Sequence, residues 1–97
     1  MSTYVVLVNY TEQGIRDINN LPDRLQALEQ GLQRAGGKLI GWYLTMGAYD
    51  AVAISELPDD DAMARLALTF GAQGRVRTTT LKAFTREQAE AIARSLP

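Results

Sequence analysis

The hydrophobic and polar positions along the chain predict four strands. Apolar residues follow one another without a break from Tyr4 to Val8, a pattern typical of a central strand covered on both faces. Two further apolar runs, residues 38–46 and 49–56, flank a Gly47-Ala48 dipeptide, and residues 75–84 form a Thr-rich fourth run. These stretches are rich in the aromatic and β-branched residues that favour strands.

Two stretches with apolar residues at helical spacing separate these strands. The first helix is expected to begin at Pro22, because proline suits the first turn, and to end at Gly36-Gly37, where one glycine takes a left-handed conformation. Its apolar stripe consists of Leu21, Leu25, Leu28, Leu32 and Ala35. Residues 11–20 are predicted to form a loop, with a short turn of helix near residues 15–18.

The second helix is expected to open at Pro58 and to end at Gly71 or Gly74. Its apolar stripe consists of Met63, Leu66, Ala67 and Phe70. Asp59-Asp60-Asp61 fall in its first turn, where acidic side chains interact favourably with the helix dipole. We favour that role for the three aspartates over the binding of a divalent cation.

A short C-terminal helix is predicted after the capping-box pattern Thr85-Arg86-Glu87-Gln88. The element order is therefore β-α-β-β-α-β followed by that helix. Under the rules for chain connections, this order predicts a four-stranded antiparallel sheet with both main helices on one face. The first and third strands should be central. We expect an α+β fold formed by one domain, residues 1–97.

The hairpin formed by residues 38–56 allows the strand register to be predicted. A two-residue loop with glycine first favours a type II′ turn at Gly47-Ala48, which pairs Met46 with Tyr49. On that register, the residues facing the helices are Trp42, Leu44, Ala51 and Ala53. The residues of the opposite face are Tyr43, Thr45, Asp50 and Glu56, with Val52 and Ile54. That face is too apolar for open solvent and too polar for an ordinary core.

The segment Gly47-Ala48-Tyr49-Asp50 resembles the Gly-x-Tyr-Asp signature of the GYD-domain proteins, small bacterial proteins of uncharacterised function. The resemblance extends over nearly the whole chain, through Tyr4-Val5-Val6-Leu7, Thr11, Gly14, Pro22-Asp23-Arg24, Gly36-Gly37-Lys38-Leu39, Pro58-Asp59-Asp60, Gly74-Arg75-Val76-Arg77-Thr78, Thr80 and Ala83-Phe84. It implies a ferredoxin-like α/β sandwich, related in architecture to the dimeric α/β-barrel proteins. It implies no particular reaction.

The composition excludes several classes of function. Ten basic and eleven acidic residues give a net charge of −1, without the basic stripe that nucleic-acid binding requires. The chain has no Cys and no His, so we expect no disulfide, no thiol catalysis, no metal site and no cofactor. No apolar run approaches the length of about 20 residues needed for a membrane span, and a cytoplasmic location is expected.

The face of the sheet opposite the helices predicts a protein partner. Burying its apolar residues against a second copy would remove several hundred Å² from water, at roughly 25 cal/mol per Å². We therefore expect a homodimer through the sheet faces, either alone or within a larger homo-oligomeric ring. The competing hypothesis is that the C-terminal helix folds over the same face within one chain.

The candidate ligand-binding residues are Tyr43, Thr45, Tyr49, Asp50 and Arg77. Asp50 has two interpretations: a ligand anchor or base at the mouth of a pocket, or a residue that caps the turn by accepting hydrogen bonds from Thr45 or backbone N–H groups. The structural role is favoured, with Tyr49 as a cross-strand packing residue.

Three arginines are further candidates for a functional role. Arg75 and Arg77 are expected on one face of an edge strand, where they bind an anion or, more commonly, meet solvent or an interface. Arg24 on the first helix is expected to make an exposed or intersubunit ion pair.

Two hypotheses for the function follow. The first is a homo-oligomeric domain that binds a small organic ligand or a partner, with no catalytic machinery of its own. The second is a cofactor-independent enzyme of the oxygenase or isomerase type, acting on a small aromatic or carbonyl compound in a cavity at the dimer interface. Asn9, Tyr10, Trp42 and Tyr43 are residue types used by such enzymes, but Trp42 and Tyr43 should point to opposite faces, and core packing is favoured for them.

Overall fold

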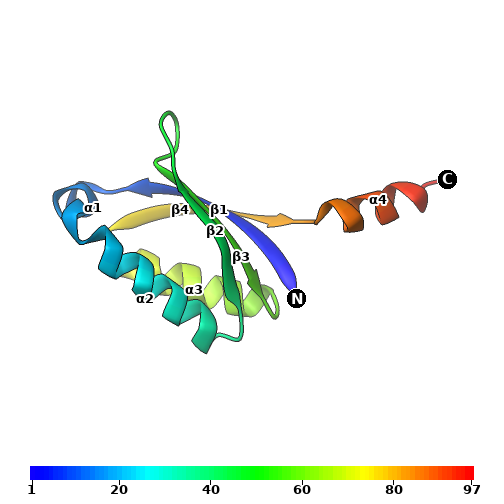
Figure 1. Ribbon diagram of the computed structural model, residues 1–97, viewed down its shortest axis with the longest axis horizontal. Helices are drawn as coiled ribbons and strands as arrows, with labels where there is room; N and C mark the ends of the chain where they lie inside the picture. Colours follow the sequence, from blue (N-terminus) through cyan, green and yellow to red (C-terminus); the bar gives the residue numbers. More distant parts are fainter.

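The fold consists of a twisted four-stranded antiparallel sheet with two helices packed side by side on one face (Figure 1). The computed structural model describes residues 1–97, and the elements are β1 (Ser2–Tyr10), α1 (Glu12–Arg16), a 3₁₀ turn (Ile18–Asn20), α2 (Leu21–Arg34), β2 (Lys38–Leu44), β3 (Ala51–Leu57), α3 (Asp60–Ala72), β4 (Val76–Ala83) and α4 (Arg86–Arg94). The strand order is β2-β3-β1-β4, so β1 and β3 are central as predicted. The α+β, ferredoxin-like arrangement is confirmed.

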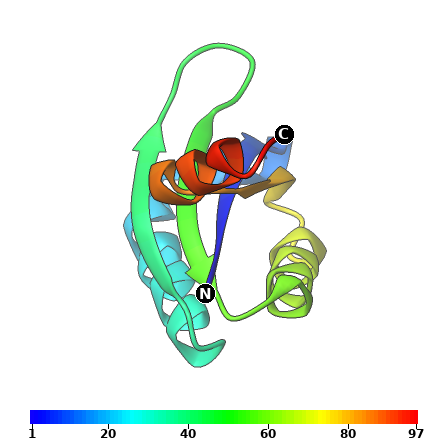
Figure 2. The same cartoon turned by 90° about the vertical axis from the view of Figure 1, so that its right-hand side faces the viewer.

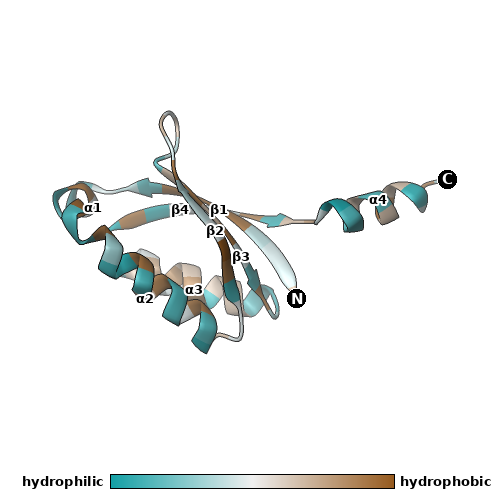
Figure 3. Cartoon of the chain, in the orientation of Figure 1, coloured by the Kyte–Doolittle hydropathy of each residue, from teal (hydrophilic) through white to brown (hydrophobic).

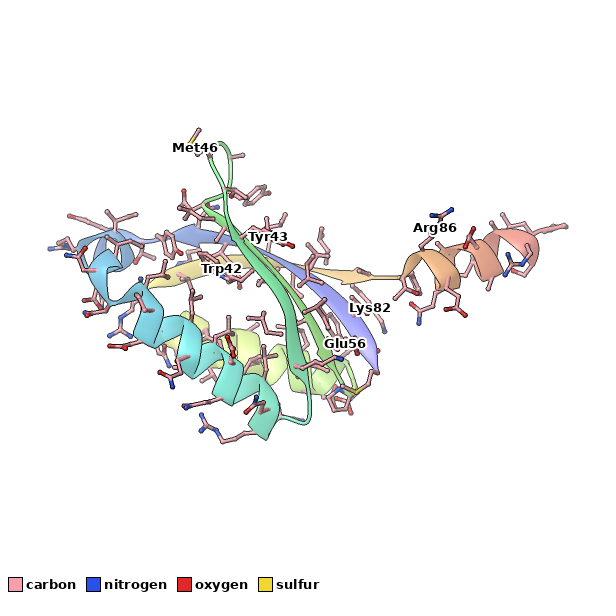
Figure 4. All side chains as sticks on the ribbon, viewed as in Figure 1. Trp42, Tyr43, Met46, Glu56, Lys82 and Arg86 are labelled. Atoms are coloured by element: carbon pink, nitrogen blue, oxygen red, sulfur yellow. The ribbon has the colours of Figure 1, made fainter.

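The register between β2 and β3 agrees with the prediction, but the connecting loop is longer. Trp42 pairs with Ala53, and Leu44 pairs with Ala51. The strands end at Leu44 and Ala51, and Met46 does not pair with Tyr49. The predicted two-residue turn is therefore wrong, although Gly47 does have a positive φ of 123°. Met46 stands almost fully exposed in the hairpin loop that projects beyond the sheet (Figure 4).

Helices α2 and α3 end at glycines that the sequence predicted, but each helix starts at a different residue from the predicted proline. Gly36, with a φ of 84°, follows the end of α2, and the Gly37 N–H donates to the Leu32 carbonyl oxygen at 2.8 Å. Gly74 plays the corresponding part after α3, with a φ of 81°. Pro58 precedes α3 instead of opening it, because the Asp59 carboxylate caps the helix by accepting from the Ala62 N–H at 2.9 Å.

Residues 11–20 are more regular than the predicted loop. Thr11 caps the short helix α1 by accepting a hydrogen bond from the Gly14 N–H, and a 3₁₀ turn follows. The Thr11 hydroxyl also donates to the Gly74 carbonyl oxygen at 2.6 Å, and the Thr11 N–H donates to the Arg75 carbonyl oxygen at 3.0 Å. These two bonds tie the β1–α2 connection to the start of β4.

The hydrophobic core lies between the sheet and the two helices, toward the N-terminal end of β1. Its buried residues are Tyr4, Leu32, Leu57, Ala62 and Met63. Alternate residues of β3 point into this layer, and Leu57 is fully buried. Leu44, predicted to face the helices, is 66% exposed because it lies at the far end of β2, next to the projecting loop.

A polar cluster attaches the start of α3 to the sheet. The buried Tyr4 hydroxyl donates a hydrogen bond to Asp60 Oδ1, and the Lys82 ammonium lies 3.0 Å from the same oxygen. The hydrogen bond from Tyr4 and then the Lys82 ammonium lower the pKa of Asp60 below its ordinary value near 3.8. Ionised Asp60 therefore stabilises the fold above that ordinary value, and this contribution is lost as the pH falls through the lowered pKa.

We expect Asp60→Asn to flatten the pH dependence of stability in acid. The wild type loses the Asp60 contribution on acidification, whereas the variant has none to lose. Urea unfolding midpoints measured between about pH 5 and pH 2 would show the smaller slope, since unfolding free energy follows the difference in protons bound. Asp61→Asn is the matched control, because Asp61 is exposed in the same turn and makes no ion pair. Equal slopes for the two variants would contradict the assignment.

The C-terminal helix α4 extends away from the rest of the chain (Figure 1), and in the end-on view of Figure 2 it stands in front of the sheet. Both bonds of the predicted capping box are present, between Thr85 Oγ1 and the Gln88 N–H and between the Gln88 side chain and the Thr85 N–H. Every residue from Phe84 to Pro97 is exposed. The helix thus leaves the open face of its own sheet uncovered. None of the helices has the length and apolar character to cross a membrane.

Candidate functional site

A cavity of about 380 Å³ lies between the helix-facing side of the sheet and helices α2 and α3. It extends from the core residues Leu32 and Met63 toward the C-terminal end of β1. Sixteen of its 22 lining residues are hydrophobic, among them Val8, Trp42 and Phe70. This volume falls in the range of small-molecule sites, which are mostly apolar with a few polar groups.

Arg24 lines this cavity from the first turns of α2. Its Nη1 and Nη2 atoms are shielded from solvent and have no hydrogen-bond partner, and the side chain forms no ion pair. Its Cζ atom lies 5.8 Å from the centre of the Tyr10 ring, a cation–π distance. The exposed ion pair expected for Arg24 is not formed.

The pKa of the Tyr10 hydroxyl is shifted by burial and by two charged groups at this end of the sheet. Burial raises the pKa of its hydroxyl, the Arg24 charge opposes that rise, and the Asp50 carboxylate adds to it. The phenol therefore stays neutral at physiological pH. A neutral aromatic ring beside an arginine provides attraction without neutralising the charge.

A second arginine, Arg75, lines the same cavity but has a partner. Its Nε atom lies 3.2 Å from Asp17 Oδ2. The prediction that Arg75 and Arg77 share one face is wrong, because Arg75 precedes β4 and lines the cavity on the helix side. Val76 and Thr78 also line the cavity, so Arg77 between them points to the opposite face.

Three of the predicted site residues come together in the hairpin loop. The Thr45 hydroxyl donates to the Tyr49 carbonyl oxygen at 2.6 Å, and the Thr45 N–H donates to the Asp50 carbonyl oxygen at 2.9 Å. Asp50 Oδ2 accepts from the Tyr10 N–H at 2.9 Å, which holds the loop against the C-terminal end of β1. These bonds are of the kind expected for a structural Asp50, and none of the three residues lines the cavity.

The other two predicted site residues lie outside that loop, on the two opposite edge strands of the sheet. Tyr43 is 61% exposed on β2, and Arg77 is exposed on β4 opposite Asn9. Since β2 and β4 are the two edges of the sheet, about 14 Å of sheet separates them at the usual strand spacing. A ligand contact by any of these five residues stays a prediction.

The open face of the sheet is the second candidate surface. Its residues are Thr3, Val5, Leu7, Asn9, Tyr43, Val52, Ile54, Glu56, Arg77, Thr79, Leu81 and Ala83. The chain exposes 6521 Å², whereas a folded monomer of its 10.7 kDa is expected to expose about 5,500 Å². Only ten residues are buried. This excess of roughly 1,000 Å², to which the exposed helix α4 also contributes, is comparable to one side of a stable protein interface.

Figure 4 places Trp42 and Tyr43 on opposite sides of β2, as the alternation of side chains predicts. Trp42 lines the cavity together with Tyr10, whereas Tyr43 and Asn9 belong to the open face. The four residues considered for cofactor-independent oxidation are therefore divided between the two faces of the sheet and do not form one site.

Sequence reasoning missed the cavity and its buried arginine, although a signal was present. Arg24 follows Leu21 by three positions and precedes Leu28 by four, so it lies within the apolar stripe of α2. A charged residue in such a stripe indicates either a side chain that reaches solvent or a polar group held in the interior. The buried nitrogens of Arg24 are the second case.

The chain is similar to known proteins over most of its length. A family model described as the GYD domain matches residues 4–93. The glutamine synthetase and cystathionine beta-lyase binding protein of Thermus thermophilus is 34% identical over 84 residues, which cover 86% of this chain and 88% of that protein.

Two solved structures share the fold. The crystal structure of TTHA0845 from Thermus thermophilus has a TM-score of 0.51 and 28% identity, covering 88% of this chain and 95% of that one. The crystal structure of FFRP-DM1 has a TM-score of 0.62 and covers 87% of this chain and 100% of that one. At 16% identity, this second similarity concerns the fold alone.

Proposed function

The chain belongs to the GYD domain family, and from this premise we propose that it is a homo-oligomeric binding domain that contacts other proteins and has no catalytic machinery of its own. The Thermus relative is named as a protein that binds glutamine synthetase and cystathionine beta-lyase. We extend an interaction role of that kind to this chain, with metabolic enzymes as the partner class. The proposal includes the cytoplasmic location expected of a cysteine-free chain.

The observation that carries the proposal is the uncovered face of the sheet. Leu7, Val52 and Ile54 meet at the centre of that face, on adjacent strands β1 and β3, with Tyr43 beside them on β2. Exposed apolar groups that are continuous over several strands mark interaction sites in soluble proteins. A second copy can present the same surface in a two-fold symmetric contact, which is the commonest way in which homodimers form.

The projecting helix α4 supports the same assembly. Figure 3 shows hydrophobic and hydrophilic residues alternating along it. Ile92 and Leu96 are 47% and 68% exposed, and Phe84 just before the helix is 61% exposed. The radius of gyration, 14.6 Å, exceeds the roughly 12.5 Å expected for a compact chain of this length. In the proposed dimer, α4 packs against the partner copy and covers these side chains.

The enzyme hypothesis receives less support. It requires a cavity at the dimer interface lined by Asp50 and a tyrosine. The cavity in this chain lies on the helix side of the sheet, and its lining includes Tyr10 but not Asp50. Asp50 uses one carboxylate oxygen to accept the Tyr10 N–H, which favours a structural role.

Sedimentation velocity on the purified chain tests the assembly, and the same samples test the interaction. We expect a dimer or a multiple of it at micromolar concentration, and co-sedimentation with purified glutamine synthetase or cystathionine beta-lyase of the source organism. Ile54→Lys places a charge at the centre of the open face, where its desolvation opposes association. The dimer dissociation constant should rise by at least about 100-fold.

Leu68→Lys is the matched control, because Leu68 is 75% exposed on α3, away from the open face. It should leave the dimer intact. A wild-type chain that sediments at 10.7 kDa at these concentrations would refute the assembly. A dimer that binds neither enzyme would leave the assembly standing and overturn the extension of the relative's partners to this chain.

A further inference from the structure

Arg24 is an uncompensated charge in the interior of the chain. A guanidinium stays protonated under all conditions compatible with folding, and it carries five N–H donors. Two of its nitrogens are shielded from solvent and donate no hydrogen bond to any protein atom. Buried polar groups in folded proteins nearly always have partners, so an exception indicates that a partner of another kind completes the site.

The neighbouring groups do not supply that partner. Asp17 pairs with Arg75 at 3.2 Å, and Asp50 accepts the Tyr10 N–H at 2.9 Å. Asp23 also lines the cavity, but it is exposed and forms no ion pair with Arg24. The Tyr10 ring offers only its face, at 5.8 Å from the Cζ atom. Two arginines thus line one cavity, and only Arg75 is neutralised by the protein.

The remaining lining of the cavity indicates the shape of the missing partner. It is dominated by aliphatic and aromatic side chains, including Leu28, Trp42, Leu66 and Phe70. A volume of about 380 Å³ is at the lower end of the range for small-molecule sites. A multiply charged or fully hydrated anion would place polar atoms against most of this apolar lining. A molecule with one charged end and an apolar body matches both the Arg24 guanidinium and the apolar lining.

We propose that this cavity binds a small organic carboxylate, whose carboxylate group pairs with the Arg24 guanidinium and whose apolar body lies against Trp42 and Phe70. A carboxylate matches the planar fork of a guanidinium and can accept two parallel hydrogen bonds from it. The site lies on the helix side of the sheet and does not depend on the protein partners or on the dimer of the open face.

Octanoate is a suitable probe, and 1-octanol is the uncharged control of the same chain length. Trp42 is the only tryptophan of the chain and lines the cavity, so its fluorescence reports binding at this site. Titration of the full chain, followed by fluorescence and by calorimetry, should show octanoate binding at least about tenfold more tightly than 1-octanol. Inorganic phosphate, which has the charge without the apolar body, should not displace octanoate.

Arg24→Met removes the charge and keeps an unbranched apolar side chain of similar length. It should weaken octanoate binding by about tenfold or more and leave 1-octanol binding unchanged. Arg34→Met is the matched control, because Arg34 is exposed on the same helix and does not line the cavity. It should bind both probes as the wild type does.

Equal affinities of the wild type for octanoate and 1-octanol would overturn the proposal, and so would unchanged octanoate binding by Arg24→Met. Absence of a Trp42 response to octanoate up to ~10 mM would also overturn it, since millimolar dissociation constants mark the weakest specific binding. The comparison of the two probes uses the wild-type chain alone, so it decides the question even if Arg24→Met fails to fold. Loss of dimerisation or of enzyme binding would not affect this result.

Discussion

Leu57→Ala is expected to lower the free energy of unfolding by about 2–5 kcal/mol, the range for replacing a buried leucine by alanine. Leu57 is 0% exposed at the end of β3, in the core cluster with Tyr4, Leu32 and Met63. Its removal leaves a cavity where the sheet, α2 and the start of α3 meet. The backbone on all sides is held by strand and helix hydrogen bonds, so the structure can collapse only partially into the space.

Urea unfolding followed by far-ultraviolet circular dichroism measures this loss. Wild type and variant must be compared at the same protein concentration, because association contributes to apparent stability. Leu68→Ala removes the same side-chain atoms from a position that is 75% exposed on α3, and it should change the free energy by less than about 0.5 kcal/mol. Similar losses for the two variants would show that Leu57 does not lie in a closely packed core.

Gly37→Ala is expected to destabilise the chain by about 3 kcal/mol, the upper end of the range for overpacking. A Cβ atom at position 37 would lie 2.0 Å from the Glu56 carbonyl oxygen and 2.8 Å from Leu57 Cδ2. The Glu56 oxygen is a backbone atom of β3, so the clash can be relieved only by moving the strand away from the α2–β2 connection. The restriction comes from this close approach of two backbones and applies to any residue larger than glycine.

The matched control is Gly71→Ala within α3. A Cβ atom there has no neighbour within 4 Å, and alanine is favoured over glycine inside a helix by about 1 kcal/mol. Chemical denaturation should therefore give opposite signs for the two glycine variants. A Gly37→Ala variant as stable as the wild type would mean that the connection between α2 and β2 is not held against β3.

The fold was predictable from the sequence because its local signals agree with one another. The register derived from the expected Gly47-Ala48 turn pairs Trp42 with Ala53, and the structure has this match of a large and a small side chain although the two-residue turn is not formed. The length of the loop was not predictable in the same way. Hydrogen bonds made by Thr45 and Asp50 side chains replace the ladder there, and one of them reaches across to Tyr10 on another strand.

The candidate cavity could not be predicted from sequence patterns, for a related reason. Arg24 lies within the apolar stripe of α2, but only the packed structure shows that no acidic side chain reaches its guanidinium nitrogens. The partner of Arg75 shows the same dependence, since Asp17 lies 58 positions earlier in the chain. Pairing over such distances depends on how the elements pack and leaves no periodic trace in the sequence.

Strand β2 contains one irregularity with a wider consequence. Leu39 pairs with Ser55 and Gly41 with Ile54, so Ile40 is an extra residue without a partner. Because of it, Leu39 and Trp42 both line the cavity, although three positions separate them. A regular ladder over the same residues would turn Leu39 or Trp42 outward, whereas deletion of Ile40 would place the two residues two positions apart and keep both on the cavity side. Relatives that lack this one residue should therefore keep the same interior side chains, whereas a shift of one residue within the regular part of the strand would exchange its two faces.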